Sequence, residues 1–186
     1  LQLDLASLES VKNFSKKFHE AETKLDILIN SAGVLCCSQS KTADGFELHL
    51  GTNHLGHFLL TNLLLDLLKQ SSPSRIVVVG GMAYKFTSFD REDLMNDNFY
   101  NKYKAYARSK IANNLFTHEL SKKLEGTGVT INVLHPGFMV TLVTRHFENS
   151  QLLKTIFGPI AKFFLKTPLE GAQTTICLAV DPDLEN

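Results

Sequence analysis

A tyrosine and a lysine, Tyr106 and Lys110, stand four residues apart in the sequence. On a helix, residues with this spacing lie on the same face. A lysine ammonium group near a phenol favours the phenolate, so we expect Lys110 to lower the pKa of Tyr106. Such a phenol can act as acid and base when a carbonyl and an alcohol are interconverted. Tyr100 and Lys104 have the same spacing, but they lie in a polar stretch and we interpret them as surface residues.

The spacing alone does not separate a catalytic pair from two structural side chains, so the surrounding elements matter. Three short apolar runs predict strands: Leu25–Asn30, Arg75–Val79 and Thr130–Leu134. Each is rich in Ile, Val or Leu and lacks strict alternation. This composition is typical of strands that are covered on both faces in a parallel sheet.

Helical periodicity separates the three predicted strands. The last helix has the clearest start, because Thr167 is a predicted N-cap, Pro168 occupies the first helical position and Glu170 completes a capping box. Asp181-Pro182 ends it. The earlier helical patterns cover Ser7–Phe18, Phe46–Leu68 and Ala105–Leu124.

Alternating helices and strands predict an α/β fold, a Rossmann-like doubly wound parallel sheet in one domain over residues 1–186. Ligands of such sheets bind beyond the carboxyl ends of the strands. The residues that follow the predicted strands are therefore candidates for chemistry. They are Asn30-Ser31-Ala32-Gly33, Gly80-Gly81 and His135-Pro136-Gly137.

A dinucleotide fold also needs a glycine-rich turn between its first strand and helix, and the sequence has none at such a place. We expect that the first βαβ portion of the sheet, roughly 30 residues or more, precedes Leu1 and that the chain is truncated at both ends. The alternative is a compact variant without this portion. With truncation, strand Leu25–Asn30 has an unpaired edge and the polypeptide alone is marginally stable or aggregates.

Composition excludes several classes of function. The 186 residues carry 19 basic and 19 acidic side chains, so no global field attracts nucleic acid or an anionic membrane. Cys36, Cys37 and Cys177 show no metal-ligand spacing, which indicates free thiols in a reducing compartment and no metal site. The longest apolar run, Leu55–Leu68, is broken by polar residues and cannot span a bilayer.

The motifs resemble, in their order, those of the short-chain dehydrogenases/reductases. The run from Asn53 to Phe58, Asn-His-Leu-Gly-His-Phe, is most similar to the retinol dehydrogenase branch, as is the region from Leu115 to Val129. The motifs that carry the resemblance are Asp4-Leu5, Asn30-Ser31-Ala32-Gly33, Asn53–Phe58, Tyr106-Ala107-Arg108-Ser109-Lys110 and His135-Pro136-Gly137.

This resemblance implies roles for individual residues. Tyr106 is the proton donor and acceptor, Lys110 holds the nicotinamide ribose, and Asn53 positions a water that relays protons through Lys110. The implied cofactor is NADP, with NAD left open, and the implied substrate is an apolar alcohol or carbonyl compound such as retinol or retinal. The implied cofactor-binding residues are Asp4, Leu5, Asn30, Ala32, Gly33, Tyr106, Lys110, Pro136, Gly137, Met139 and Thr141.

One implied catalytic position lacks its side chain. The family has a serine where this chain has Gly81, and loss of one donor to a developing oxyanion costs about 10²–10³ in rate in hydrolytic enzymes. Thr87 or Ser88 is an alternative donor. Two interpretations stay open: a weak or specialised oxidoreductase, or an inactive relative that binds a nucleotide or a partner.

A broad apolar stripe lies within Leu152–Leu165. It is interpreted as a lid over an apolar substrate or a membrane-surface contact, with packing against the core as the alternative. The resemblance further implies a homodimer face on Ala105–Leu124 and a location in the cytoplasm or on the cytosolic face of the endoplasmic reticulum.

Overall fold

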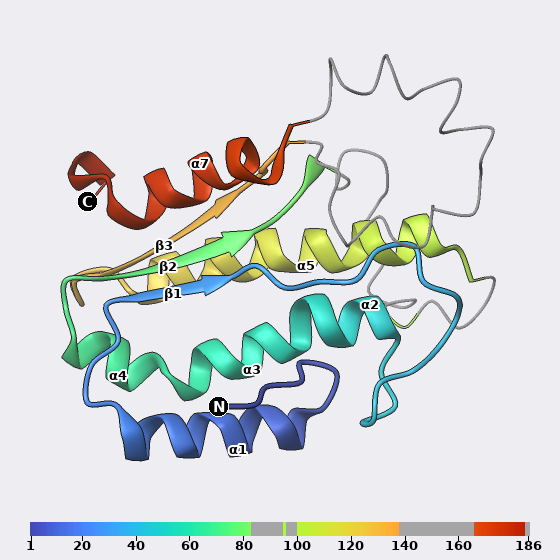
Figure 1. The fold of residues 1–186 in the computed structure, drawn as a ribbon, viewed down its shortest axis with the longest axis horizontal. Helices are drawn as coiled ribbons and strands as arrows, with labels where there is room; N and C mark the ends of the chain where they lie inside the picture. Colours follow the sequence, from blue (N-terminus) through green and yellow to red (C-terminus); the bar gives the residue numbers. More distant parts are fainter. Residues whose placement is uncertain (83–94, 96–99, 138–165, 185–186) are drawn as a thin grey trace.

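A computed structural model describes residues 1–82, 95, 100–137 and 166–184 (Figure 1). Its strands β1 (Ile27–Asn30), β2 (Ser74–Val79) and β3 (Val129–Leu134) form a parallel sheet in the order β1-β2-β3. In the register, Asn30 is the partner of Val78, and Val79 is the partner of Leu134. The three strands therefore end at one edge, and the predicted parallel sheet is confirmed.

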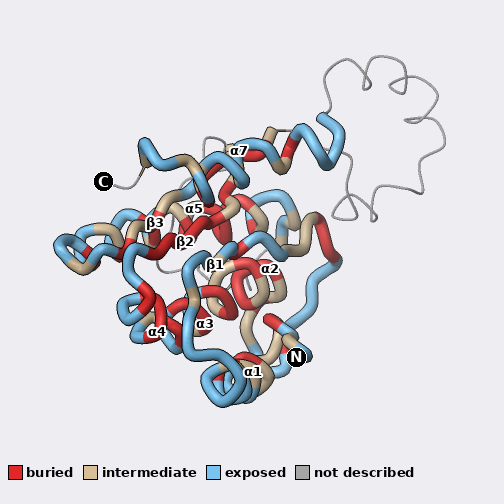
Figure 2. The backbone as a smooth tube through the Cα atoms, turned by 60° about the vertical axis from the view of Figure 1, so that its left-hand side comes forward, coloured by how far each residue is buried: buried red, intermediate tan, exposed pale blue. Residues whose placement is uncertain are grey.

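Helices cover both faces of the sheet, as the doubly wound prediction requires (Figures 1 and 2). Helix α5 (Lys102–Lys123) and helix α4 (Leu65–Gln70) pack on one face, and α7 (Pro168–Val180) packs over β2 and β3 on the other. Helix α1 (Leu8–Ala21) packs against α3 (Gly56–Leu63). A short 3₁₀ turn, η4 (Pro182–Leu184), follows α7. The predicted capping box of Thr167 and Glu170 is present at the start of α7.

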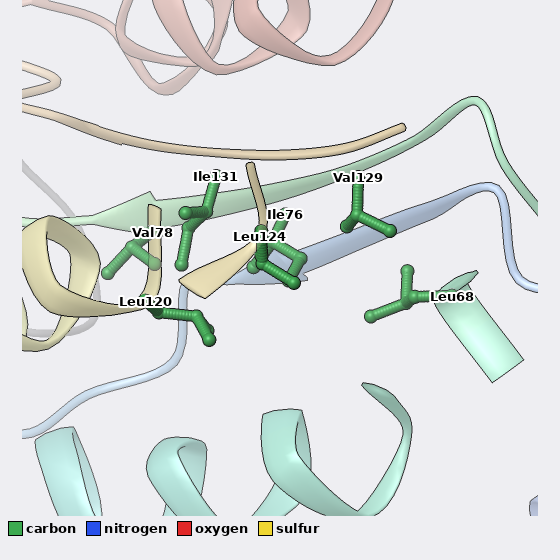
Figure 3. Close-up of a cluster of buried hydrophobic side chains, with 7 residues drawn as sticks. All are labelled: Leu68, Ile76, Val78, Leu120, Leu124, Val129 and Ile131. Carbon is green, nitrogen blue, oxygen red and sulfur yellow. The ribbon is translucent and has the colours of Figure 1, made fainter. Parts of the chain in front are cut away.

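The core of the sheet lies on the α5 side (Figure 3). Ile76 from the central strand is fully buried there. Since this packing fixes α5 across β2 and β3, it sets which α5 side chains reach the carboxyl ends of the strands. The buried members of the cluster are Leu68, Ile76, Val78, Leu120, Leu124, Val129 and Ile131.

The helical stretch predicted as Phe46–Leu68 is divided in the structure. It begins with α2 (Leu48–Leu50), continues as a π-helical turn, η1 (Gly51–Leu55), and passes into α3. Leu64, with φ −98° and ψ 1°, separates α3 from α4. A π-helical turn widens the backbone spiral and is frequent at functional sites; here it contains Asn53.

The prediction that every strand is covered on both faces is wrong for β1. Ile27 and Ile29 are 37% and 45% exposed, since α7 packs over β2 and β3. Among the described residues β1 pairs only with β2, so the unpaired edge expected from the sequence is present in this part of the chain.

Candidate active site

Tyr106 and Lys110 lie near the N-terminal end of α5, beside the carboxyl end of β2. The Lys110 Nζ donates a hydrogen bond of 2.8 Å to the Val79 carbonyl oxygen and lies 5.7 Å from the centre of the Tyr106 ring. Lys110 is 5% exposed, and burial lowers its pKa to about 8. The lysine predicted from spacing is thus a buried group anchored to the central strand.

The electrostatic effect on Tyr106 differs from the prediction. Burial, and to a lesser extent the neighbouring Cys36, raises the pKa of Tyr106, whereas we expected Lys110 to lower it. Desolvation disfavours the phenolate and outweighs an ammonium group that is held by the Val79 carbonyl. The phenol in this structure is therefore protonated at neutral pH.

Gly81 faces this pair. A Cβ atom built on Gly81 would lie 3.5 Å from the Tyr106 hydroxyl oxygen and 3.8 Å from the Lys110 Cγ, both ordinary van der Waals distances. A small side chain at this position would therefore fit and would contact the phenol. Thr87 and Ser88, the alternative donors, lie outside the described residues.

Asn53 is fully buried and joins three segments. Its Oδ1 accepts a hydrogen bond of 2.7 Å from the Val34 N–H, and its Nδ2 donates to the Val34 carbonyl and the Ser109 hydroxyl, each at 3.0 Å. Its own carbonyl accepts a bond of 3.0 Å from the Asn113 Nδ2. These contacts fix the loop after β1 against α5; the water-positioning role of Asn53 stays a prediction.

Two cofactor candidates follow β1. Asn30 is 2% exposed and donates from Nδ2 to the Thr61 hydroxyl at 2.8 Å, while its Oδ1 has no hydrogen-bond partner. Ala32 is exposed. A Cβ on Gly33 would lie 3.1 Å from the Asn53 Oδ1, so glycine allows the close approach of this loop.

The remaining described candidates precede α1 or follow β3. Asp4 is exposed, and the adjacent buried Leu5 contacts Gly56 at the start of α3. Pro136 and Gly137 follow β3, where Gly137 adopts φ +89°, a conformation that favours glycine. Met139, Thr141 and the proposed lid Leu152–Leu165 lie outside the described residues.

The sequence interpretation missed a second cluster near Tyr106. The Tyr100 hydroxyl donates to the Cys37 carbonyl at 2.8 Å, and burial and the Glu47 charge raise the Tyr100 pKa to about 12. The interpretation of Tyr100 as a surface residue is therefore wrong, although Lys104 is exposed. Buried Glu47 and His49 form the rest of the cluster, with a Glu47 Oε1 to His49 Nδ1 distance of 2.7 Å. No spacing rule brings together groups from three separate segments.

Comparison with known proteins decides the family. A family model described as "short chain dehydrogenase" matches residues 1–151. The chain belongs to the short chain dehydrogenase family. Among curated relatives it is 55% identical to "Retinol dehydrogenase 14" of Mus musculus and 47% identical to "Retinol dehydrogenase 11" of Homo sapiens, each match covering 99% of this chain. The chain spans 55% and 57%, respectively, of the length of these relatives.

Solved structures resemble this member of the family. A protein from Mycobacterium paratuberculosis shares 40% identity, with a TM-score of 0.66 over 83% of this chain and 57% of that one. The "RhlG/NADP active-site complex" of Pseudomonas aeruginosa shares 26% identity, with a TM-score of 0.72 over 97% of this chain and 69% of that one. The Rossmann-type fold expected from the sequence is confirmed.

The described residues fit one half of a nicotinamide dinucleotide. Lys110 offers ammonium donors, Gly81 places no side chain beside the phenol, and the buried Asn30 Oδ1 lacks a partner. In the described part of the chain no glycine-rich turn joins a strand to a helix, so a pyrophosphate cradle is not among these elements. The described residues also contain no group of three or more His, Cys, Asp or Glu that could hold a metal ion.

Proposed function

We propose that the protein is an NAD(P)-dependent oxidoreductase that interconverts an apolar alcohol and the corresponding aldehyde or ketone. The observation that carries the proposal is the position of the Tyr106 hydroxyl beside Gly81, with Lys110 anchored to Val79. These residues lie at the carboxyl ends of parallel strands, where this architecture binds ligands.

In this proposal Tyr106 donates a proton to the carbonyl oxygen of the substrate during reduction. Burial raises the pKa of Tyr106, so the phenol is protonated at neutral pH and has a proton to donate. A bound nicotinamide supplies the hydride. Lys110, charged below its pKa of about 8, binds the ribose hydroxyls and stabilises a phenolate after proton transfer.

We assign NADP as the preferred cofactor, because a structural relative binds it. The proposed contacts are the phenol and ammonium of the catalytic pair, Asp4 and Leu5 near the adenine, the loop after β1 and the turn after β3. Titration of the fluorescence of the reduced nicotinamide reports binding. At least tenfold tighter binding of NADPH than of NADH is expected, and the reverse order would reject this assignment.

A second candidate function rests on Gly81. Without a hydroxyl at this position the substrate oxygen has one donor fewer, and the protein would bind a nucleotide or a partner without turnover. The test uses the whole protein with Gly81→Ser, which the open space permits, and Gly81→Ala as the matched control. Hydride transfer to all-trans-retinal is measured.

The oxidoreductase proposal expects Gly81→Ser to raise the rate at least tenfold, in line with the effect of one oxyanion donor, and Gly81→Ala to leave it unchanged. No turnover in any variant, together with tight nucleotide binding in all, would favour the binding function.

The substrate class and the partners are proposed from the relatives. Their retinol dehydrogenase names support an apolar substrate such as retinal, and residues 152–165 are assigned as its lid or as a membrane-surface contact. Deletion of this segment should raise the KM for retinal more than for a small aldehyde. Equal increases in the KM for both aldehydes would reject the assignment of this segment as a lid. No described helix is both long and apolar enough to cross a bilayer; a place in the cytoplasm or at the cytosolic face of the endoplasmic reticulum is proposed.

A homodimer is proposed through an apolar groove between α3 and α5, lined in part by Phe58, Leu115 and Phe116. Phe58 and Leu115 are 43% and 47% exposed. Leu115→Glu should convert a dimer to a monomer in sedimentation experiments. An unchanged sedimentation coefficient would place the contact elsewhere.

A further inference from the structure

We propose that His49, held by Glu47, is a positioning residue that fixes the ring of Tyr106 so that its hydroxyl faces the gap left by Gly81. The proposal rests on the function proposed above for Tyr106. It concerns two side chains from α2 and its N-cap, which the catalytic scheme does not otherwise use.

His49 is rigidly held in the interior. It is fully buried, and Glu47 is 3% exposed. The Nδ1 of His49 donates to the Glu47 Oε1 at 2.7 Å, and its Nε2 accepts a bond of 3.3 Å from the Cys37 N–H. This pattern fits the neutral ring protonated at Nδ1, an assignment made from the hydrogen-bond partners.

The carboxylate of Glu47 is itself fixed. Its Oε1 also accepts from the His49 N–H and its Oε2 accepts from the Leu50 N–H, each at 2.9 Å. Glu47 is thus the N-cap of α2 and the support of the imidazole at the same time. A buried carboxylate with these donors has little freedom, so the histidine ring that it binds has a defined orientation.

The imidazole meets Tyr106 edge to face. The two ring centres are 6.4 Å apart and their planes make an angle of 76°. Aromatic pairs prefer this arrangement because the positive edge of one ring faces the negative face of the other. The Lys110 Nζ lies 5.7 Å from the centre of the same Tyr106 ring. The phenol ring therefore has both His49 and Lys110 as neighbours.

The contact with His49 matters because the Tyr106 hydroxyl has no hydrogen-bond partner among the described residues, and Gly81 has no side chain that could offer one. Packing against His49 then orients the Tyr106 ring alone. A serine hydroxyl at position 81 would help to orient it through a hydrogen bond to the phenol. It follows that His49 and position 81 are coupled: the contribution of His49 to turnover should shrink when a serine hydroxyl at position 81 can hold the phenol.

The test is a double-mutant cycle on the whole protein with His49→Asn and Gly81→Ser. Asparagine keeps a donor for Glu47 and removes the ring edge. We expect His49→Asn to lower kcat for retinal reduction at least tenfold with Gly81, and less than threefold with Gly81→Ser. KM and the Kd of the nucleotide should stay within twofold. Equal losses of kcat in both backgrounds, or no loss, would overturn the proposal.

His54→Asn is the matched control. His54 is helical like His49 but only partly buried. Its ring packs near those of Phe58 and Phe116, and its Nδ1 lies 3.0 Å from the Asn113 Oδ1. Its effect on kcat should be the same in both backgrounds. Coupling of the same size for His54 would show a general loss of stability and would also overturn the proposal.

A second measurement does not need turnover. The Tyr106 hydroxyl is titrated by NMR in tyrosine-labelled protein, with Tyr106→Phe for assignment and exposed Tyr103 as internal reference. Loss of the imidazole lets water reach the ring, so His49→Asn should lower the Tyr106 pKa by at least half a unit and leave that of Tyr103 unchanged. An unchanged Tyr106 pKa would reject the positioning role. Absence of turnover in the parent and in Gly81→Ser would reject the proposed function alone, and the titration would then decide the role of His49.

Discussion

Lys110 donates a hydrogen bond from Nζ to the backbone carbonyl oxygen of Val79 at 2.8 Å, and this bond joins α5 to the end of the central strand. Lysine is rarely buried, and burial here lowers its pKa to about 8. The protonation state of Lys110 therefore depends on how α5 packs against the sheet.

Lys110→Met should change how stability depends on pH. The pKa of Lys110 is about 8 in the folded protein against an ordinary value of 10.5. Between these values the unfolded chain binds more protons, so this group makes stability rise as pH rises, by at most about 3 kcal/mol. In the variant, the free energy of unfolding measured with urea should no longer show this rise between pH 7 and 10.5. Lys104→Met, at an exposed position, is the control, and a rise retained in Lys110→Met would contradict the buried charge.

Tyr106→Phe should reduce kcat by at least about 10²-fold, the usual range for a lost general acid. The ring and its contact with His49 are kept, so the nucleotide Kd should change less than threefold. Tyr103→Phe is the matched control, because Tyr103 is 57% exposed and lies on the same helix. Comparable kcat values for Tyr106→Phe and the parent would remove Tyr106 from the chemistry.

His57 should make the protein sensitive to acid. Burial lowers its pKa to about 4, below the ordinary value of 6.5, and its Nδ1 lies 3.0 Å from the Asn53 carbonyl oxygen. In this interval the unfolded state binds more protons, so the stability from neutral His57 is present above pH 6.5 and is lost as pH falls towards 4. In the His57→Gln variant the urea midpoint should fall less steeply as the pH is lowered from 6.5 to 4. His118→Gln, an exposed change, should not reduce this steepness.

The sequence predicted the parts of the fold that depend on local pattern. Apolar runs located all three described strands within two residues of their observed starts, and Thr167 with Glu170 located the start of α7. The π-helical turn around Asn53 and the break at Leu64 were not predicted, because apolar periodicity continues through both. The exposure of Ile27 and Ile29 was not predicted either, since a run of apolar residues does not say which faces are covered.

The sequence predicted those site residues that lie together on one helix. It did not predict contacts between residues on different elements. Tyr106 and Lys110 lie on one helix, so their spacing brought them together. The direction of the Tyr106 pKa depends on burial, which spacing does not measure. The contacts of His49 with Cys37, Tyr100 and Tyr106 join segments far apart in the chain. These depend on the packing of α2 against α5.

Gly56→Ala should destabilise the protein and weaken nucleotide binding. A Cβ at Gly56 would lie 2.5 Å from the Leu5 carbonyl oxygen, so either the segment of Asp4 and Leu5 or the start of α3 must shift. Such overpacking typically lowers the free energy of unfolding by about 1–3 kcal/mol. The change is measured as a lower urea concentration at the midpoint of unfolding. Gly81→Ala is the control, because its Cβ would meet only ordinary contacts at 3.5 and 3.8 Å. If Asp4 and Leu5 line the adenine and this segment is the part that shifts, the Kd for NADPH should rise several-fold in Gly56→Ala. A lower midpoint with an unchanged Kd would contradict the prediction for nucleotide binding and would leave Gly56 a purely structural glycine.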